Sequence, residues 1–351
     1  MEKRSHFIRD LRIASVASLA LVLAAAGCGG SGHAAGPRGG GGGTTAGTSG
    51  VTQGVITAFG TIHMGSGSHE KVFDVDDAIL KRLDDGVEHD RTGDDAVVFR
   101  VGMKVEVFHD ADSTRATEVR FKDDIEGPIT AKPSTHAGAT FDVLGVPVLV
   151  DGQTHFDDTI ENSGLTLAGL TVGNVIELSG LFDANGVLHA TFIEGEHASA
   201  AGRTFEIKGE LTGLAGTAPN QTFKVNGVTF NMNAGSELRD LATGLNEGTS
   251  VEVKTQSTSA PFVVTRIEGL AGDFDEMENE VRDAREASVE GFVVGLSGTA
   301  PDLSFTLAGV RVTTSAATVG LGLVAPNAHI EAEGPVGATG EIKAIKIASR
   351  P

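Results

Sequence analysis

The sequence contains two closely matched stretches that decide its fold, Gly209-Glu-Leu-Thr-Gly-Leu-Ala-Gly-Thr-Ala-Pro219 and Gly291-Phe-Val-Val-Gly-Leu-Ser-Gly-Thr-Ala-Pro301. Each is followed by a second matched segment, Phe223-Lys-Val-Asn-Gly-Val-Thr-Phe230 and Phe305-Thr-Leu-Ala-Gly-Val-Arg-Val312. Polar and apolar residues alternate in these segments, which is the two-residue period of a β-strand. Because self-similarity at a regular spacing indicates repeat architecture, a repeated β-rich unit is predicted.

Two further copies lie upstream. One opens at Gly127-Pro-Ile-Thr-Ala131 and continues in Phe141-Asp-Val-Leu-Gly-Val-Pro-Val148, and a divergent copy opens at Gly54-Val-Ile-Thr-Ala-Phe59. A third element, Gly-x-x-[Val/Ile]-Glu, recurs as Gly102–Glu106, Gly173–Glu177 and Gly248–Glu252, and the last copy reads Asn327–Glu331. Asn follows Gly in its tolerance of positive φ, so these four positions are expected to share that backbone conformation.

The pattern predicts an all-β protein of four tandem repeats, covering residues 51–124, 125–200, 204–271 and 289–348. Five or so short antiparallel strands in each repeat close most economically as a small barrel of the oligonucleotide/oligosaccharide-binding type, because closure removes exposed edges. A variable insertion, such as residues 78–83, is expected to be helical or looped. Residues 272–288 are expected to form a short linking helix, since Phe274, Met277, Val281 and Ala284 recur at helical spacing.

These motifs together resemble the bacterial repeat family known as domain of unknown function 5666. The resemblance covers about residues 51–348, nearly all of the chain after its first fifty residues. It implies an exported and often lipidated protein, and it brings no catalytic residues to this sequence.

The first fifty residues have the layout of an export signal. A basic start precedes a 14-residue apolar stretch, Ile13 to Ala26, which is too short to span a bilayer. It ends in Ala25-Ala-Gly-Cys28, which resembles the bacterial lipobox, and Cys28 is the only cysteine of the chain. Residues 1–27 are therefore predicted to be a lipoprotein signal peptide, and Cys28 the acylated anchor to a lipid membrane. Residues 28–50, rich in glycine, form a predicted flexible tether, and Gly29 after the cysteine favours the outer membrane by resemblance to enteric sorting.

The composition limits the partners. The chain has a net charge of -20, and removing residues 1–27, which hold four bases and two acids, leaves -22. Such a chain is repelled by nucleic acid, so cations or basic partners are favoured. The sequence also has no Trp and no Tyr, the side chains on which sugars and single-stranded nucleic acids usually stack.

Acidic side chains supply the candidate metal site. Asp74, Asp76, Asp77, Asp84 and Asp85 crowd the first insertion, and calcium needs six to eight oxygen ligands on a compact loop. The alternative is a solvated acidic loop. The motif repeats one glutamate in each copy: Glu106, Glu177, Glu252 and Glu331. These side chains are expected to point to solvent, away from each barrel core. The alternative is that each contacts a cation or a partner. The histidines are scattered singly, and His63 and His69, which could meet across a turn, are expected to be polar surface residues.

The sequence contains no HExxH helix, GxSxG elbow or P-loop. We therefore expect a non-enzymatic lipoprotein anchored in the bacterial cell envelope, whose barrels act as a spacer or as a scaffold for an envelope protein. The alternative is a calcium- or cation-responsive binding module outside the cytoplasm. A third possibility, an enzyme that uses dispersed carboxylates, requires a pocket in which two of them converge.

Overall fold

The computed structural model describes residues 49–65, 67–84, 87–92, 99–110, 114–157, 165–241, 244–270, 281 and 284–350. The predicted signal peptide, Cys28 and the tether up to residue 48 lie outside these residues, as does most of the predicted linking helix. The described residues belong to one compact unit. Among them, the structure has no helix with the length and apolar character needed to span a bilayer.

Strands make up each repeat. Repeat 1 contains β1 (Ser49–Ala58), β2 (Ile62–Met64), η1 (Gly67–His69), β3 (Lys71–Phe73), β4 (Ile79–Asp84), β5 (Val87–Thr92), β6 (Lys104–Asp110) and β7 (Ala116–Lys122). Repeat 2 contains β8 (Ile125–Ala131), β9 (Phe141–Val143), β10 (Val146–Leu149), β11 (His155–Asp157), β12 (Val175–Phe182) and β13 (Leu188–His197).

Repeat 3 contains β14 (Phe205–Thr217), β15 (Asn220–Val225), β16 (Val228–Asn231), β17 (Glu237–Arg239), β18 (Ser250–Thr255) and β19 (Phe262–Gly269). Repeat 4 contains β20 (Glu286–Phe292), β21 (Val294–Thr299), β22 (Asp302–Leu307), β23 (Val310–Thr313), η3 (Leu321–Leu323), β24 (His329–Pro335), β25 (Ile342–Lys343) and β26 (Lys346–Ser349). Because β20 begins at Glu286, the last three residues of the predicted linker are strand.

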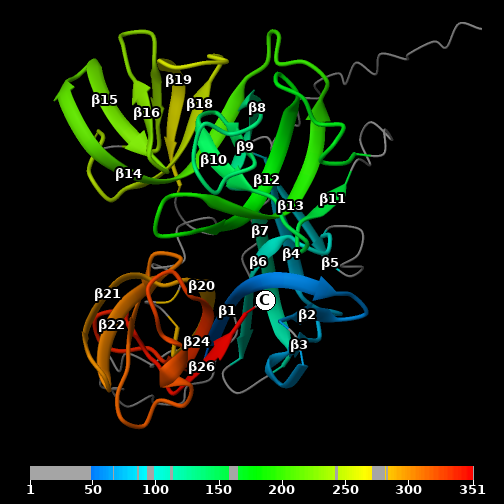
Figure 1. Cartoon of the computed structure of the whole chain (residues 1–351), viewed down its shortest axis with the longest axis vertical. Coiled ribbons are helices and arrows are strands. Elements are labelled where there is room, and N and C mark those ends of the chain that lie inside the picture. The colour runs from blue at the N-terminus through cyan, green and yellow to red at the C-terminus, as the bar shows by residue number, and fades with distance from the viewer. Residues whose placement is uncertain are drawn as a thin grey trace, which may run out of the picture. The chain divides into compact units, whose positions relative to one another are not determined.

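Each repeat closes into a five-stranded ring. In repeat 2 the order is β8-β9-β10-β13-β12 and back to β8, with only the β10–β13 pair parallel. Repeat 3 has the same ring in β14-β15-β16-β19-β18. Repeat 4 has the same ring, but its first strand is divided into β20 and β21 and its last strand into β25 and β26. Figure 1 shows β20, β24 and β26 side by side. The predicted small barrel is confirmed, and it has the five-stranded Greek-key form of the oligonucleotide/oligosaccharide-binding fold.

Repeat 1 closes its ring with a single bridge. Strand β3 is short, and Asp74 directly after it pairs in parallel with Arg115, the residue directly before β7. The segment containing residues 78–83, expected to be helical or looped, is instead strand β4. It pairs in parallel with β7 and antiparallel with β5, so both of its edges are hydrogen-bonded, and it buries Leu80 in the core of repeat 1.

In repeats 2, 3 and 4 the opening glycine contacts the hairpin turn of the second matched segment. The Leu144-Gly145, Asn226-Gly227 and Ala308-Gly309 pairs all have positive φ, which is the type I′ turn of a tight hairpin. The glycine that opens each of these repeats lies beneath that turn. A Cβ on Gly127 would come within 2.6 Å of Leu144, and one on Gly209 or Gly291 would crowd Asn226 or Ala308.

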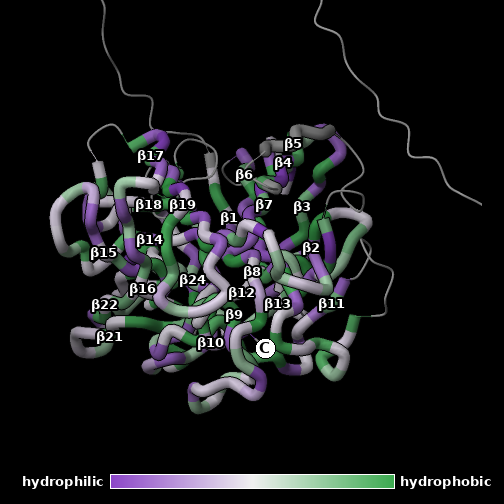
Figure 2. Tube along the Cα trace, turned by 90° about the horizontal axis from the view of Figure 1, so that it is seen from above, coloured by the Kyte–Doolittle hydropathy of each residue, from purple (hydrophilic) through white to green (hydrophobic). Residues whose placement is uncertain are grey.

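The third element of the motif also has the predicted conformation. Gly102, Gly173 and Gly248 have φ values of 96°, 95° and 78°, and Asn327 has a φ of 62°. Hydrophobic and hydrophilic residues alternate along the strands (Figure 2). The phenylalanines of the second element are buried in the cores, as the alternation predicts: Phe141, Phe223 and Phe305.

The first strand of each barrel also joins a second barrel. Residues Gly50 to Gln53 of β1 pair in parallel with Glu286 to Val289 of β20, so repeats 1 and 4 share a sheet. Strand β8 pairs antiparallel with β14, so repeats 2 and 3 share another. The cores interlock as well, because Phe192 of repeat 2 packs in the core of repeat 1 and Val51 of repeat 1 packs in that of repeat 4.

Replacing Ala308 with Asn tests the hairpin turn. Ala308 is exposed and has a φ of 45°, a conformation that costs an L-residue about 1 kcal/mol and that Asn tolerates better. We expect Ala308→Asn to raise the free energy of unfolding by up to about 1 kcal/mol in denaturant titrations. Ala317→Asn, at an exposed alanine without positive φ, is the control and should change stability by less than about 0.5 kcal/mol. Equal effects of the two substitutions would contradict this reading of the turn.

Candidate functional site

The predicted aspartate site is spread over a turn and a strand. Asp74, Asp76 and Asp77 are exposed on the turn after β3. Asp74 Oδ1 accepts a hydrogen bond from the Asp76 backbone N–H at 3.1 Å, and Asp77 pairs with Arg115 at 2.6 Å. Asp84 ends β4, and Asp85 lies outside the described residues, so the structure does not test the predicted site as a whole.

The repeated glutamates differ from their prediction. Glu177, Glu252 and Glu331 are only 6%, 3% and 5% exposed, and Glu106 is half-buried. The alternation correctly turns them away from the barrel cores, but other charged side chains and neighbouring repeats cover the face that they occupy. The expectation of solvated glutamates was therefore wrong for three of the four.

Basic side chains accompany the buried glutamates. Glu177 of repeat 2 receives Arg82 of repeat 1, with Nη2 3.3 Å from Oε1. Glu331 of repeat 4 receives Lys71 of repeat 1 at 3.4 Å and is also bonded by Arg350. Glu252 lies 3.0 Å from Lys254 within its own repeat. Burying a carboxylate is costly without such a partner, so these pairs permit the covered face.

A row of like charges crosses the shared sheet of repeats 2 and 3. Glu194, Glu177, Glu126 and Glu206 oppose one another in register on β13, β12, β8 and β14. Lys254 on β18 continues the row beside Glu206. Like charges directly opposite destabilise a sheet, so this row needs cations from outside it.

Lys208 supplies one of these cations. Its Nζ lies 2.5 Å from Asp123 Oδ1 and 4.0 Å from Glu252, and it also bonds Glu206. Burial alone would lower the pKa of Lys208, but Asp123 and Glu206 outweigh burial and raise it well above its ordinary value. Lys208 therefore stays charged and connects the repeat 1–repeat 2 junction at Asp123 to repeat 3.

The two main partners of Lys208 have opposite pKa shifts. Burial would raise the pKa of Glu206, but Lys208 and Lys254 outweigh it and hold that pKa at about 2. Burial raises the pKa of Asp123 to about 6 in spite of Lys208. Glu206 therefore contributes stability above its ordinary pKa that is lost as the pH falls toward 2. Asp123 contributes stability at low pH that is lost as the pH rises through 6.

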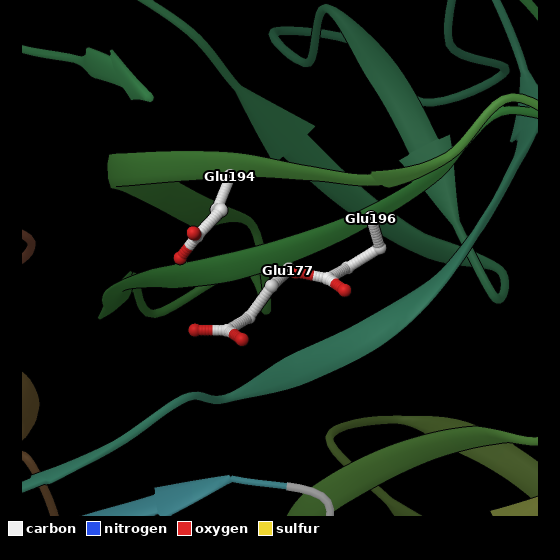
Figure 3. A group of neighbouring side chains, drawn as sticks. All are labelled: Glu177, Glu194 and Glu196. Atoms are coloured by element: carbon white, nitrogen blue, oxygen red, sulfur yellow. The ribbon is translucent and has the colours of Figure 1, made fainter. Parts of the chain in front are cut away.

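Three carboxylates lie close enough to share a metal ion within the described part of the chain. Glu177, Glu194 and Glu196 place one oxygen each within 4.8 Å of the others, from neighbouring strands β12 and β13 (Figure 3). Arg82 Nη2 lies 3.0 Å from Glu194 and also contacts Glu177. Burial, and then Asp123, raises the pKa of Glu177 well above its ordinary value. Arg82 thus already neutralises part of the charge of these carboxylates, and a metal ion bound there would compete with it.

A cavity of about 360 Å³ is lined by residues of all four repeats. Its wall includes Gln53 and Lys104 of repeat 1, Phe182 of repeat 2, Lys208 of repeat 3 and Thr306 of repeat 4. Lys104 is paired with Asp124 at 2.7 Å, and the lining holds three lysines and four acidic residues. A lining with charges of both signs in similar number suits water or a small neutral polar molecule.

One loop brings together the residue types of a hydrolase triad. Ser134, His136 and Asp142 lie together in repeat 2, but the Ser134 hydroxyl donates its hydrogen bond to Asp142 and accepts one from the His136 backbone N–H. His136 Nδ1 is 3.4 Å from Asp142. A nucleophile must be bonded to its base, and here the serine is bonded to the acid, so this cluster organises a loop.

Lys208→Met tests the role of the buried charges. The substitution removes the cation from Asp123, Glu206 and Glu252, so we expect a loss of about 3–5 kcal/mol of unfolding free energy near pH 7.5. Near pH 5 the loss should be smaller, because Asp123, with its pKa of about 6, is then largely neutral. Lys224→Met, at an exposed lysine on β15, is the control and should cost less than about 0.5 kcal/mol in the same denaturant titrations. A cost for Lys208→Met as small as that of the control would refute a structural role for the cation.

Comparison with known proteins identifies the repeats. Three segments, residues 126–194, 208–268 and 290–348, each match the family described as Domain of unknown function (DUF5666). No curated protein matches the chain. Among solved structures, the Drosophila structure titled Unr CSD456 has 12% sequence identity and a TM-score of 0.16, and the match covers 63% of this chain and 97% of that chain. That score is too low to indicate a shared overall fold. The three segments together span more than half of the sequence and lie in repeats 2, 3 and 4, so this chain belongs to the DUF5666 family.

Proposed function

We propose that this protein is a non-enzymatic lipoprotein of the bacterial cell envelope whose four barrels act as a scaffold for an envelope protein partner. The anchor is supported by the sequence Ala25-Ala-Gly-Cys28 and by the apolar stretch before it. The glycine-rich tether of about 22 residues would span about 25 Å as a random coil, enough to hold the barrels clear of the membrane. The outer membrane is the proposed location, with the barrels facing the periplasm or the exterior.

The observation that carries the scaffold proposal is the joining of the barrels. A flexible string of domains would keep its charged faces in water, whereas this chain buries Glu177 under Arg82 and Glu331 under Lys71 of another repeat. Pairing of β1 with β20 joins the same two repeats as the Glu331–Lys71 pair, and pairing of β8 with β14 joins repeat 3 to repeat 2. Joined barrels of this kind suit the presentation of a fixed surface to a partner.

The charge of the chain indicates the kind of partner. With a net charge of -22 after residue 27, the protein would meet a basic protein surface at an increased rate and would be repelled by nucleic acid. Cross-linking in intact cells followed by capture of the full chain tests this proposal. Recovery of the same basic envelope protein in repeated captures would support it. Turnover of a substrate by the purified chain, with no partner recovered, would overturn it.

Cys28→Ser tests the anchor. The variant loses the only thiol that can be acylated, so we expect the protein to move from the membrane fraction to the soluble fraction on cell fractionation. Ser31→Ala, in the adjacent tether, is the matched control and should leave the protein in the membrane fraction. Intact mass measurement should show acyl chains on the parent protein and on Ser31→Ala, but not on Cys28→Ser. Equal membrane retention of the parent and Cys28→Ser would contradict the proposed anchor.

Cation binding is the second candidate function. Its motivating observations are the exposed Asp74, Asp76 and Asp77 and the close trio of Glu177, Glu194 and Glu196. A calcium site occupied a hundredfold above its dissociation constant would add about 2.7 kcal/mol to the stability, a visible rise in melting temperature. Calorimetric melts of the full chain with millimolar calcium and with excess chelator measure this rise. Coincident melts would exclude this function, and a rise would be assigned by repeating it with Asp74→Asn and Glu194→Gln.

A further inference from the structure

Repeat 4 is held to repeats 1 and 2 by contacts that each contain a buried or half-buried histidine. His109 on β6 lies at the contact with repeat 1, beside the paired strands β1 and β20. His189 on β13 lies at the contact with repeat 2, where its ring packs at a tilt against Phe292 of β20. The contact with repeat 1 also contains the Lys71–Glu331 ion pair, and the shared sheet of repeats 2 and 3 is lined by carboxylates and lysines.

His109 is built into its contact as a neutral imidazole. Its Nδ1 lies 3.0 Å from the carbonyl oxygen of Asp110 and its Nε2 lies 3.2 Å from the hydroxyl of Thr52, so one nitrogen donates and the other accepts. The ring packs against Gly50 of β1, where a Cβ would come within 2.3 Å of the ring. A second proton would leave Nε2 as a donor and require the Thr52 hydroxyl to turn.

Cations and anions both face the His109 ring. Lys71 comes from β3, Asp110 from its own strand and Glu286 from β20, while Arg285 lines the same cavity of about 180 Å³. Burial lowers the pKa of His109, the Asp110 carbonyl opposes this, and Lys71 lowers it further. The lowering prevails, so His109 is neutral near pH 7 and protonates more readily when its contact opens.

The second contact is a cluster of three rings. Phe292 lies between His189, at 4.2 Å between ring centroids, and His329, at 4.8 Å. Asp183 and Asp151 face His189, and Glu290 approaches His329 to 3.0 Å, with Arg350 beyond it. Burial outweighs Asp183 and lowers the pKa of His189, and His329 adds to the lowering. Protonation of His189 thus places a charge beside Phe292 and near a second histidine.

Buried carboxylates, among them Asp123 and Glu177, join repeats 1, 2 and 3, and we call them the carboxylate layer. This layer responds to acid in the opposite direction. The pKa of Asp123 is raised to about 6, and that of Glu177 is raised well above its ordinary value. Groups with raised pKa values gain protons in the folded state first, so acidification stabilises this layer. Groups with lowered pKa values, His109 and His189, gain protons first in the open state, so acidification destabilises their contacts below about pH 6.5.

We propose that mild acid selectively loosens repeat 4 from repeats 1 and 2, while repeats 1, 2 and 3 remain joined. The device consists of two neutral imidazoles packed into one set of contacts and a lysine-bridged carboxylate layer in the other. Loosening exposes the β1–β20 pairing edge and Phe292, which are otherwise covered. Repeat 4 would thus offer a new surface when the compartment of the protein becomes acidic.

Hydrogen exchange of the full chain, followed by mass spectrometry near pH 7.5 and near pH 5.5 and corrected for intrinsic rates, measures the effect. We expect exchange in β1 and β20 to rise by about threefold to tenfold at the lower pH. Exchange in β12, β14 and β18 should stay constant or fall. Equal protection of β1 and β20 at both pH values would overturn the proposal.

The His109→Gln and His189→Gln double variant identifies the groups responsible. Glutamine can donate and accept as the neutral imidazole does but does not titrate, so we expect the acid response of β1 and β20 to disappear. His136→Gln, at an exposed histidine in repeat 2, is the control and should respond like the parent. If the double variant fails to fold, His189→Gln alone should remove the response near Phe292 and leave that of β1. An acid response of β1 and β20 that persists in the double variant, or one near Phe292 that persists in His189→Gln, would overturn the role of the histidines.

Discussion

The structure depends on one electrostatic constraint: a charged strand face can be covered by another barrel only when an opposite charge is buried with it. A single buried carboxylate would cost several kcal/mol, and pairing with a cation offsets most of that cost. Lys208 between Asp123 and Glu206 meets this constraint at the centre of repeats 1 to 3, and Arg82 meets it over Glu177. Buried ion pairs of this kind contribute less to net stability than to the choice of neighbour, because a wrong neighbour would leave the charge unpaired.

The same positions explain why the barrels recognise one another although they are repeats. The residue before each opening glycine faces the repeated glutamate across the ladder: Gln53 faces Glu106, Glu126 faces Glu177, Lys208 faces Glu252 and Glu290 faces Glu331. The four copies therefore share a backbone but carry different charges at one place. Only repeat 3 has a cation there, and that cation serves the acids of the repeat 1–repeat 2 junction.

Much of the fold follows from local sequence, and the covering of its outer faces does not. The Phe-x-Val-x-Gly-Val segments predict a strand, a tight turn and a strand, and the four Gly or Asn positions predict positive φ, because both depend on neighbouring residues alone. Alternation also places Glu252 away from the core. Whether water or another charged side chain covers Glu252 depends on residues such as Lys208, which is distant in sequence. The polar residue before each opening glycine is the signal in the sequence that indicates a covered outer face.

Residues 78–83 show a second limit of local sequence. An apolar and basic run of this length suits a helix as well as a strand, and the choice is made by the free edge of β7, which β4 fills. The backbone of Asp74 also has a tertiary role, because its bridge to Arg115 closes the first barrel. In both places the role of the backbone depends on a strand that is distant in sequence.

Differential scanning calorimetry of the full chain near pH 7.5 tests most directly whether the barrels are joined as one body. Unfolding of a joined body is a single transition whose calorimetric enthalpy equals its van't Hoff enthalpy. The account predicts this equality for the parent chain, since the charges buried between repeats lose their partners when any one barrel unfolds. Several separate transitions, each with the enthalpy of a domain of about 70 residues, would contradict it.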